Sequence, residues 1–296
     1  MREDAFSRRT FLTAVSLATL AAGSTASAFG AKKGGGPNDP ARRLCYKKTP
    51  QRDLFAHLYF PADWKPTDRR VAIVFYFGGG WTQGSPNQFA TQAEHFARRG
   101  MVAVCPEYRV KGRDGVEPET CVEDAKSAVR WLRVNQQALA IDPARIVASG
   151  GSAGGHLAAC TALTPDIVGR NEDPAVSSQT CAMVLFNPVV SVIGAERVHG
   201  DFTEKLLSPI LYLKAGGPPA VLFYGAKDKL LAGGEEFVRR SKELGNRADL
   251  HVTPGQDHGF FTDPPFRGQT QQVADEFLVS LGLLNAEASK PRKKRG

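Results

Sequence analysis

The sequence has few cysteines and lacks the spacings that hold metals. Its 296 residues include five cysteines, none of which forms a Cys-x-x-Cys pair, and no histidine stands at zinc-finger spacing from them. These patterns exclude a structural zinc site. Since the count is odd, at least one thiol is free, and we expect the cysteines to behave as small buried hydrophobic residues.

Long apolar runs are also missing, because none reaches the ~20 residues that span a bilayer. The first, at residues 11–22, follows the adjacent Arg8 and Arg9 and precedes Ala-Ser-Ala at residues 26–28. This order is typical of a cleavable export signal, and the paired arginines resemble the bacterial twin-arginine type. We therefore predict that residues 1–28 direct export and that the mature protein is periplasmic or extracellular. An uncleaved membrane anchor is the alternative.

The net charge of +8 is not spread over the chain. Residues 49–289 contain 24 basic and 27 acidic residues, so the excess of positive charge lies at the two ends. This distribution gives no basic face that could follow a phosphate backbone, and we expect no nucleic-acid partner. We interpret residues 29–48 as a basic linker that contains Gly and Pro. Residues 286–296 form a basic tail, which either binds an anionic surface or is a solvated end.

Between these ends, strand-like apolar runs alternate with helical segments. Strands are expected at 54–60, 71–77, 101–105, 146–149, 181–186, 220–224 and 250–253, and helices at 88–99, 119–137, 153–163, 235–244 and 271–281. Such alternation predicts one α/β domain over residues 49–285, with a mostly parallel sheet and helices on both faces. Residues 187–217 are either a small lid over the sheet edge or an ordinary crossover helix with long loops.

The strongest motif is Gly-Gly-Ser-Ala-Gly at residues 150–154, between an expected strand and an expected helix. Gly-x-Ser-x-Gly in this setting is a nucleophile elbow, in which a tight turn exposes the hydroxyl of Ser152 above the sheet. The small neighbours avoid collisions at the turn. The following helix N-terminus favours a developing anion.

A second glycine-rich motif, Phe-Gly-Gly-Gly-Trp at residues 77–81, directly follows the expected strand at 71–77. Glycines let backbone N–H groups turn inward, so these groups, with that of Ala153, can bind the oxyanion of a tetrahedral intermediate. Neither a phosphate-binding P-loop nor a dinucleotide-binding glycine motif is present. Trp81 and, further along, Tyr108 could line the substrate site or could be packing residues.

A nucleophilic serine needs a base, and the base needs an orienting acid. Of the six histidines, His258 lies in a turn-rich loop after the last expected strand, at the sheet edge where Ser152 emerges. Asp228 ends the preceding strand and is the expected acid. Its rival Asp257 is adjacent to His258, and neighbouring side chains in an extended segment point apart.

The chain order Ser152, Asp228, His258 is that of the α/β-hydrolases. The sequence resembles the hormone-sensitive-lipase-like bacterial carboxylesterases, exported acetyl esterases in particular, in its Gly-Ser-Ala-Gly-Gly core at 151–155, its Asp-Pro-Ala-Arg-Ile run at 142–146 and its Tyr-Arg step at 108–109. The resemblance implies an eight-stranded sheet, no metal or organic cofactor, and Gly79 and Gly80 as oxyanion donors. Phe77 departs from the family, which usually has His there.

We therefore expect a serine carboxylesterase that hydrolyses short acyl esters, acetyl esters above all, with carbohydrate as the alcohol. The carbohydrate substrate is an inference from the resemblance and from export. An exported peptidase or amidase of the same fold, or a non-catalytic binding protein, are the alternatives.

Overall fold

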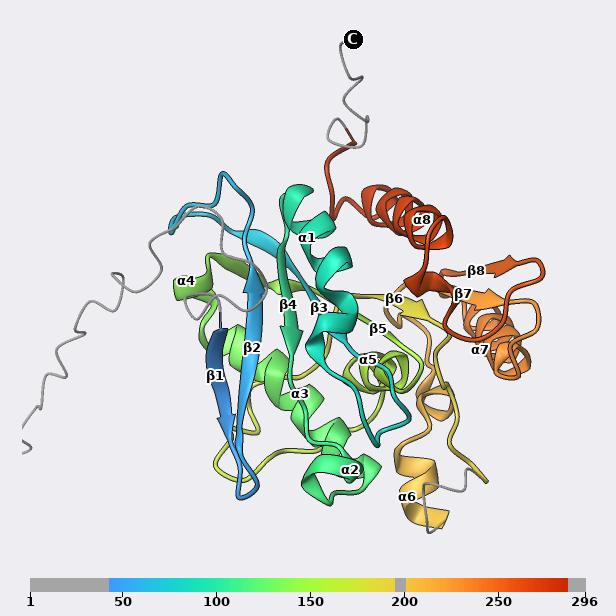
Figure 1. The fold of residues 1–296 in the computed structure, drawn as a ribbon, viewed down its shortest axis with the longest axis horizontal. Helices are drawn as coiled ribbons and strands as arrows, with labels where there is room; N and C mark the ends of the chain where they lie inside the picture. Colours follow the sequence, from blue (N-terminus) through green and yellow to red (C-terminus); the bar gives the residue numbers. More distant parts are fainter. Residues whose placement is uncertain (1–42, 195–200, 287–296) are drawn as a thin grey trace, which may run out of the picture.

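The computed structural model describes residues 43–194 and 201–286. The predicted export signal, the first part of the predicted linker and nearly all of the basic tail lie outside these residues. A single sheet of eight strands runs through the domain (Figure 1). The strands are β1 (Arg43–Lys48), β2 (Asp53–Tyr59), β3 (Arg70–Tyr76), β4 (Val102–Pro106), β5 (Ile141–Gly151), β6 (Ala182–Phe186), β7 (Ala220–Gly225) and β8 (Ala248–Thr253).

The spatial order of the strands is β1-β2-β4-β3-β5-β6-β7-β8. β2 is antiparallel to both β1 and β4, and the strands from β4 to β8 are parallel. The mostly parallel sheet is the one that the strand–helix alternation predicted, and its eight strands are the number that the family resemblance implied. Because parallel strands end at the same edge, the loops after β3, β5, β7 and β8 gather at one edge of the sheet.

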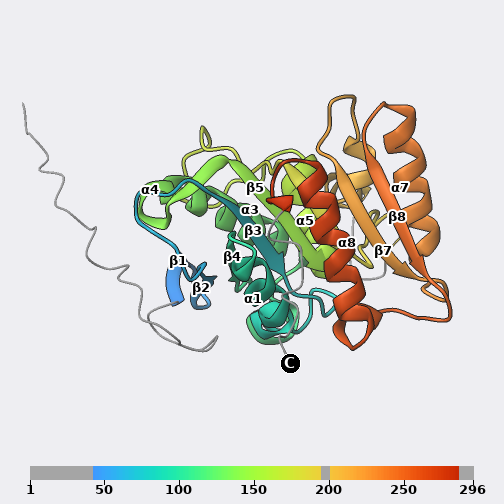
Figure 2. The ribbon, with the colours of Figure 1, turned by 90° about the horizontal axis from the view of Figure 1, so that it is seen from above.

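Helices cover both faces of the sheet, as predicted. The α-helices are α1 (Ala90–Arg98), α2 (Lys111–Asp114), α3 (Pro118–Val134), α4 (Gln136–Leu139), α5 (Ala153–Leu163), α6 (Asp201–Leu206), α7 (Leu231–Glu243) and α8 (Phe266–Ser280), and short 3-10 helices are η2 (Pro86–Phe89), η3 (Pro209–Tyr212) and η4 (Phe260–Thr262). One core cluster joins the sheet to α3, α5 and α7, and the other joins it to α1 and α8. Figure 2 shows α7 and α8 on opposite sides of β7 and β8.

The apolar sequence of β3 explains why both faces are covered. Successive side chains of a strand point to opposite faces, so Ile73 and Phe75 enter the core under α1 while Val74 and Tyr76 enter the core under α5. All four are fully buried. A strand that is apolar at every position therefore requires helices on both sides.

The predicted linker ends too late. Residues 43–48 form β1, which pairs with β2 at the sheet edge, so the domain begins at or before residue 43 and not at 49. The prediction failed because an edge strand is only half buried. Its basic side chains find acidic partners far along the chain, as in the contacts of Arg43 with Glu107 and of Lys47 with Asp124.

The inserted segment at 187–217 contains α6 and η3. Leu207 and Ile210 are buried in the core beside α5. Residues 195–200 lie outside the described part of the chain, and the lid stays a prediction.

All five cysteines lie within the described residues and all are free thiols. Cys105, Cys121 and Cys160 are buried, as expected, whereas Cys181 is half-buried and Cys45 is exposed. Within the described residues no helix is both long enough and apolar enough to cross a membrane.

Candidate active site

Ser152 stands at the turn between β5 and α5, with φ 54° and ψ −121°. This left-handed region is rare for a residue with a side chain, and the turn is tight enough to exclude side chains on both sides. A Cβ on Gly150 would lie 2.4 Å from the carbonyl oxygen of Gly154, and one on Gly154 would lie 2.0 Å from that of Tyr76. The small residues of the motif therefore let α5 start against β3 with Ser152 at its N-cap.

His258 and Asp228 complete a hydrogen-bonded chain with this serine. The Nε2 atom of His258 lies 2.8 Å from Oγ of Ser152, and its Nδ1 atom lies 2.9 Å from Oδ2 of Asp228. The His258 side chain is 40% exposed, whereas that of Asp228 is 2% exposed. The base can therefore reach a substrate from the open side while the acid is shielded from water.

Asp257, the rival acid, has a different contact. Its Oδ1 atom accepts a hydrogen bond of 2.7 Å from the backbone N–H of His258. The Asp257 carboxylate thus bonds the backbone of the loop and not the imidazole ring of His258. The structure places Asp228, and not Asp257, against the imidazole.

Asn187 is a site residue that the sequence reasoning missed. It follows β6, is fully buried and donates a short hydrogen bond from Nδ2 to Oδ2 of Asp228, the same oxygen that faces His258. The backbone N–H of Leu230 donates to Oδ1 at 2.9 Å. Both carboxylate oxygens are thereby held. Its place after a buried parallel strand, at the edge that carries Ser152, was the signal that could have singled it out.

The glycine-rich loop after β3 lies against the serine. A Cβ on Gly78 would meet the Gly151 carbonyl oxygen at 2.9 Å and Cβ of Ser152 at 3.3 Å. Gly79 and Gly80 have φ of 127° and 60°, which glycine adopts at no steric cost. The side-chain oxygen of Gln88 accepts from the Gly78 N–H at 2.5 Å, which fixes the start of this loop next to the Ser152 turn.

A cavity of about 680 Å³ opens above Ser152. It is lined by Gly78, Gly79, Gly80, Gln88, Ser152 and residues 256–263. No described residue of the inserted segment 187–217 lines it. The cavity thus lies between the glycine-rich loop and the loop that carries His258.

Trp81 and Tyr108, offered as substrate contacts or packing residues, are packing residues. Neither lines the cavity, and they are 6% and 0% exposed. The Tyr108 hydroxyl donates to the Phe77 carbonyl at 2.7 Å and its ring stacks on Phe77 at 3.9 Å. Phe77 stands where the resembled family usually has His, and here an aromatic stack holds the base of the loop.

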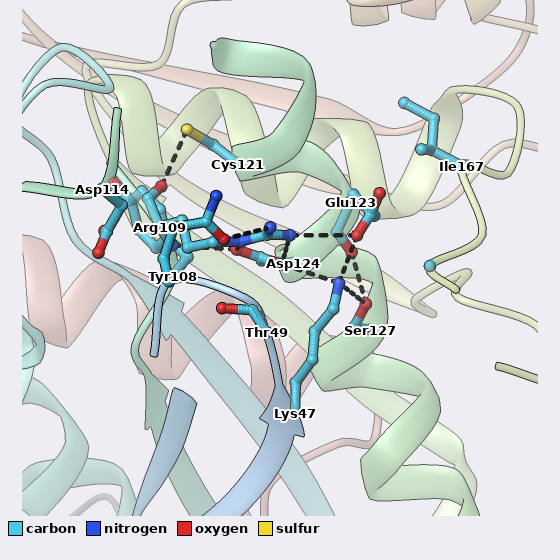
Figure 3. A network of polar contacts seen from close by, with 12 residues as sticks. Lys47, Thr49, Tyr108, Arg109, Asp114, Cys121, Glu123, Asp124, Ser127 and Ile167 are labelled. Atoms are coloured by element: carbon cyan, nitrogen blue, oxygen red, sulfur yellow. Dashed lines mark hydrogen bonds and ion pairs between the residues drawn. The ribbon is translucent and has the colours of Figure 1, made fainter. Parts of the chain in front are cut away.

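A charged network fixes the segment that carries Tyr108 (Figure 3). Asp124 of α3 is fully buried and accepts from Arg109 through both carboxylate oxygens, at 2.8 Å from Nε and 2.7 Å from Nη2. The Lys47 ammonium of β1 lies 2.8 Å from the same carboxylate. The segment that follows Arg109 bonds the end of the glycine-rich loop, because the backbone N–H groups of Lys111 and Gly112 donate to the carbonyls of Trp81 and Thr82. The charged network therefore helps to fix the position of that loop.

Among the described residues, no group of three or more His, Cys, Asp or Glu side chains is arranged to hold a metal ion. Around Ser152, a hydroxyl, an imidazole and a carboxylate form one hydrogen-bonded chain beside the glycine-rich loop, an arrangement that suits nucleophilic catalysis.

Comparison with known proteins agrees with this geometry. A family model described as BD-FAE matches residues 57–185. A thermophilic esterase of the planctomycete Thermogutta terrifontis, solved with propionate bound, is 45% identical with a TM-score of 0.78, and the match covers 82% of this chain and 95% of that one. The same esterase has been solved phosphorylated by paraoxon, with 47% identity.

More distant relatives are also ester hydrolases by name. An ethyl acetate hydrolase of Pseudomonas putida is 26% identical over 76% of each chain. A probable isoprenylcysteine alpha-carbonyl methylesterase of rice is 26% identical over 84% of this chain, but the match spans only 64% of the rice protein. The eight-stranded fold, the nucleophile-elbow geometry and the Thermogutta match together place this chain in a family: it belongs to the hormone-sensitive-lipase-like esterases of the α/β-hydrolase superfamily.

Proposed function

We propose that this protein is a serine carboxylesterase of short-chain esters in which Ser152, His258 and Asp228 are the catalytic residues. The observation that carries the proposal is the hydrogen-bonded chain from Oγ of Ser152 through His258 to Asp228, open to a cavity on the serine side. The three side chains come from three separate loops, so their convergence at the sheet edge is a property of the whole fold.

In the proposed reaction, His258 removes the proton of Ser152 as Oγ attacks the ester carbonyl carbon. The resulting oxyanion accepts hydrogen bonds from the N–H groups of Gly79, Gly80 and Ala153. His258 then gives its proton to the alcohol oxygen, and the carbon–oxygen bond to the alcohol breaks. Water, activated by the same imidazole, hydrolyses the acyl-enzyme and restores Ser152.

Asp228 keeps Nδ1 of His258 protonated and stabilises the imidazolium that forms in each step. Asn187 and the Leu230 N–H occupy the remaining sites of its carboxylate. The third partner of this carboxylate is the Nδ1–H of His258, which lies against Oδ2.

Short acyl chains are the preferred acyl groups in this proposal. One similar esterase was solved with propionate bound, and another relative is named an ethyl acetate hydrolase. The alcohol side is proposed to be polar, carbohydrate included, because Gln88, Gln256, Thr262 and two exposed aspartates, Asp257 and Asp263, line the cavity.

The experiment is hydrolysis of p-nitrophenyl acetate, butyrate and octanoate by wild type and by Ser152→Ala. Wild type is expected to prefer acetate and butyrate, and the variant to lose about 10⁴-fold or more in kcat. Equal rates for the two proteins would refute the role of Ser152. Acetate release from acetylated xylan, compared with p-nitrophenyl acetate, separates a carbohydrate esterase from a general one.

We also propose that residues 1–28 export the protein and are removed. The support is the sequence alone: adjacent Arg8 and Arg9, a short apolar stretch and a small-residue cleavage site. Replacing both arginines by lysine is expected to retain the protein in the cytoplasm of a bacterial host. Unchanged export of that variant, with N-terminal sequencing of the product, would rule out the twin-arginine route.

A further inference from the structure

Three consecutive residues of the glycine-rich loop have positive φ, and the third is not glycine. After Gly79 and Gly80 comes Trp81, with φ 60°. A bulky side chain disfavours this left-handed conformation, which persists only where the surroundings over-determine it. Its contacts therefore identify what holds the loop in shape.

Trp81 is anchored through its side chain. Its indole Nε1–H donates to Nδ1 of His156 at 3.2 Å, and the two rings meet edge to face at 5.3 Å. Its backbone carbonyl accepts from the Lys111 N–H at 2.9 Å. The indole is 6% exposed, so its one polar atom depends on His156 for a partner.

His156 is fixed on both sides of its ring. It is fully buried, and its Nε2 atom lies 2.6 Å from the carbonyl oxygen of Leu207. A carbonyl can only accept, so Nε2 carries the proton and Nδ1 is the acceptor for Trp81. Burial lowers the pKa of His156 to about 4, which keeps the ring neutral and this tautomer in place at neutral pH.

The position of His156 gives this contact a mechanical consequence. His156 lies one turn after Ser152 on α5, and the backbone N–H of His156 donates to the Ser152 carbonyl at 3.0 Å. A hydrogen bond from Trp81 to His156 therefore ties the glycine-rich loop to the helix that begins at the nucleophile. Leu207, on the other side of the ring, belongs to the inserted segment.

We propose that His156 is a positioning residue that holds Gly79 and Gly80 at a fixed offset from Ser152 by anchoring Trp81. The inference rests on the proposed esterase function and on the proposed oxyanion role of these glycines. Because oxyanion donors act in the transition state and not in substrate binding, loss of the anchor lowers kcat and leaves KM nearly unchanged.

The test uses two substitutions that each keep half of the ring's hydrogen bonding. His156→Asn retains an acceptor near the place of Nδ1 for Trp81, whereas His156→Gln retains a donor near Nε2 for Leu207 and loses the acceptor. Trp81→Phe removes the indole N–H together with part of the ring, and provides a second route should a His156 variant fold poorly.

With p-nitrophenyl acetate, His156→Gln and Trp81→Phe are expected to lower kcat about tenfold or more, with KM within about threefold of wild type. His156→Asn is expected to lose about threefold at most. The double variant, His156→Gln with Trp81→Phe, is expected to be no worse than the more impaired single one, since both remove the same bond.

The hydrogen-exchange rate of the Trp81 indole N–H gives a measurement independent of turnover, and is expected to rise in His156→Gln and not in His156→Asn. Provided that the wild type is active, equal losses of kcat in His156→Gln and His156→Asn would overturn the positioning role. A double variant whose loss of kcat equals the product of the two single losses would also overturn it. A wild type that hydrolyses no ester would refute the proposed function and this inference with it.

Discussion

At Ser152 the backbone adopts a conformation that serine alone would avoid, and its neighbours explain why it is tolerated. Gly150 and Gly154 have no room for a Cβ, and the Ser152 N–H donates to the Phe186 carbonyl at 2.8 Å. The motif predicted this turn because its glycines report a steric requirement that is local. Asn187 was not predicted, since its contact with Asp228 spans two strands and has no local pattern.

The two neighbouring acids of the site offer a matched pair of substitutions. Asp228→Asn should lower kcat by about 10³–10⁴-fold, because the amide cannot hold His258 in the required tautomer. With p-nitrophenyl acetate, Asp257→Asn should change kcat by less than about threefold, because that carboxylate bonds the backbone N–H of His258 and not its ring. Steady-state kinetics at pH 8 measures kcat of both variants. Equal losses of kcat would contradict the assignment of Asp228 as the acid that orients the His258 ring.

The buried His156 predicts a pH-dependent stability. Its pKa is about 4 in the fold and 6.5 when unfolded, so the unfolded chain takes up the proton first as the pH falls. Above pH 6.5 this group does not reduce the free energy of unfolding. As the pH falls from 6.5 to 4, the free energy of unfolding decreases, and the loss reaches about 3 kcal/mol at pH 4.

Urea unfolding of wild type and His156→Asn at pH 7.5, 5.5 and 4.5 measures this contribution. The free energy of unfolding of wild type should fall more steeply with acid than that of the variant, which has no group to titrate there. Parallel pH profiles would show that the pKa of His156 is not lowered in the folded protein.

At the scale of elements, the segment between β4 and α3 connects the charged network to the catalytic loop. Arg52 donates to the Tyr108 carbonyl at 3.1 Å and to Asp114 at 3.0 Å. Arg43, Arg52 and His57 surround Glu107, whose pKa they lower to about 2 against the opposing effect of burial. The sequence did not predict this network, because most of its ion pairs join residues at least 50 positions apart and leave no periodic pattern. It did not predict β1 because an edge strand is only half buried.

Asp124→Asn tests how much this network contributes. The change leaves Arg109 and Lys47 without their buried counter-charge, and should lower the free energy of unfolding by about 3–5 kcal/mol. Chemical denaturation at pH 7 measures the loss. Glu236→Gln is the control, since its contacts with Arg239 and Arg240 on α7 are at the surface and such pairs contribute little. Equal losses in the two variants would contradict the account.

Across the whole molecule, the strand–helix alternation was sufficient to predict the mostly parallel sheet, apart from its edge strand β1, and the two helical layers. Helix 153–163 has the predicted bounds, whereas α7 and α8 begin four and five residues before the predicted starts at 235 and 271. Apolar periodicity marks the buried faces, and the partly exposed first turns of α7 and α8 carry too little of it. The roles of the basic ends, which lie mostly outside the described residues, stay predictions.

Free cysteines distributed through the domain predict how the molecule reacts with a thiol reagent. Burial raises the pKa of Cys160 to about 12 and places those of Cys105 and Cys121 higher still. In the native protein only Cys45 should react fast with Ellman's reagent, followed slowly by Cys181, and all five should react in guanidinium chloride. Cys45→Ser should remove the fast phase. Fewer than five thiols after denaturation would indicate a disulfide and contradict the structure.

The most direct measurement of the central claim is the site of covalent labelling by an organophosphate ester. Wild-type protein treated with paraoxon should lose esterase activity in proportion to the incorporation of one diethylphosphoryl group, and peptide mass spectrometry should place that group on Ser152. Ser152→Ala should incorporate none. Labelling at another residue, or full ester hydrolysis by a protein already phosphorylated on Ser152, would contradict the account.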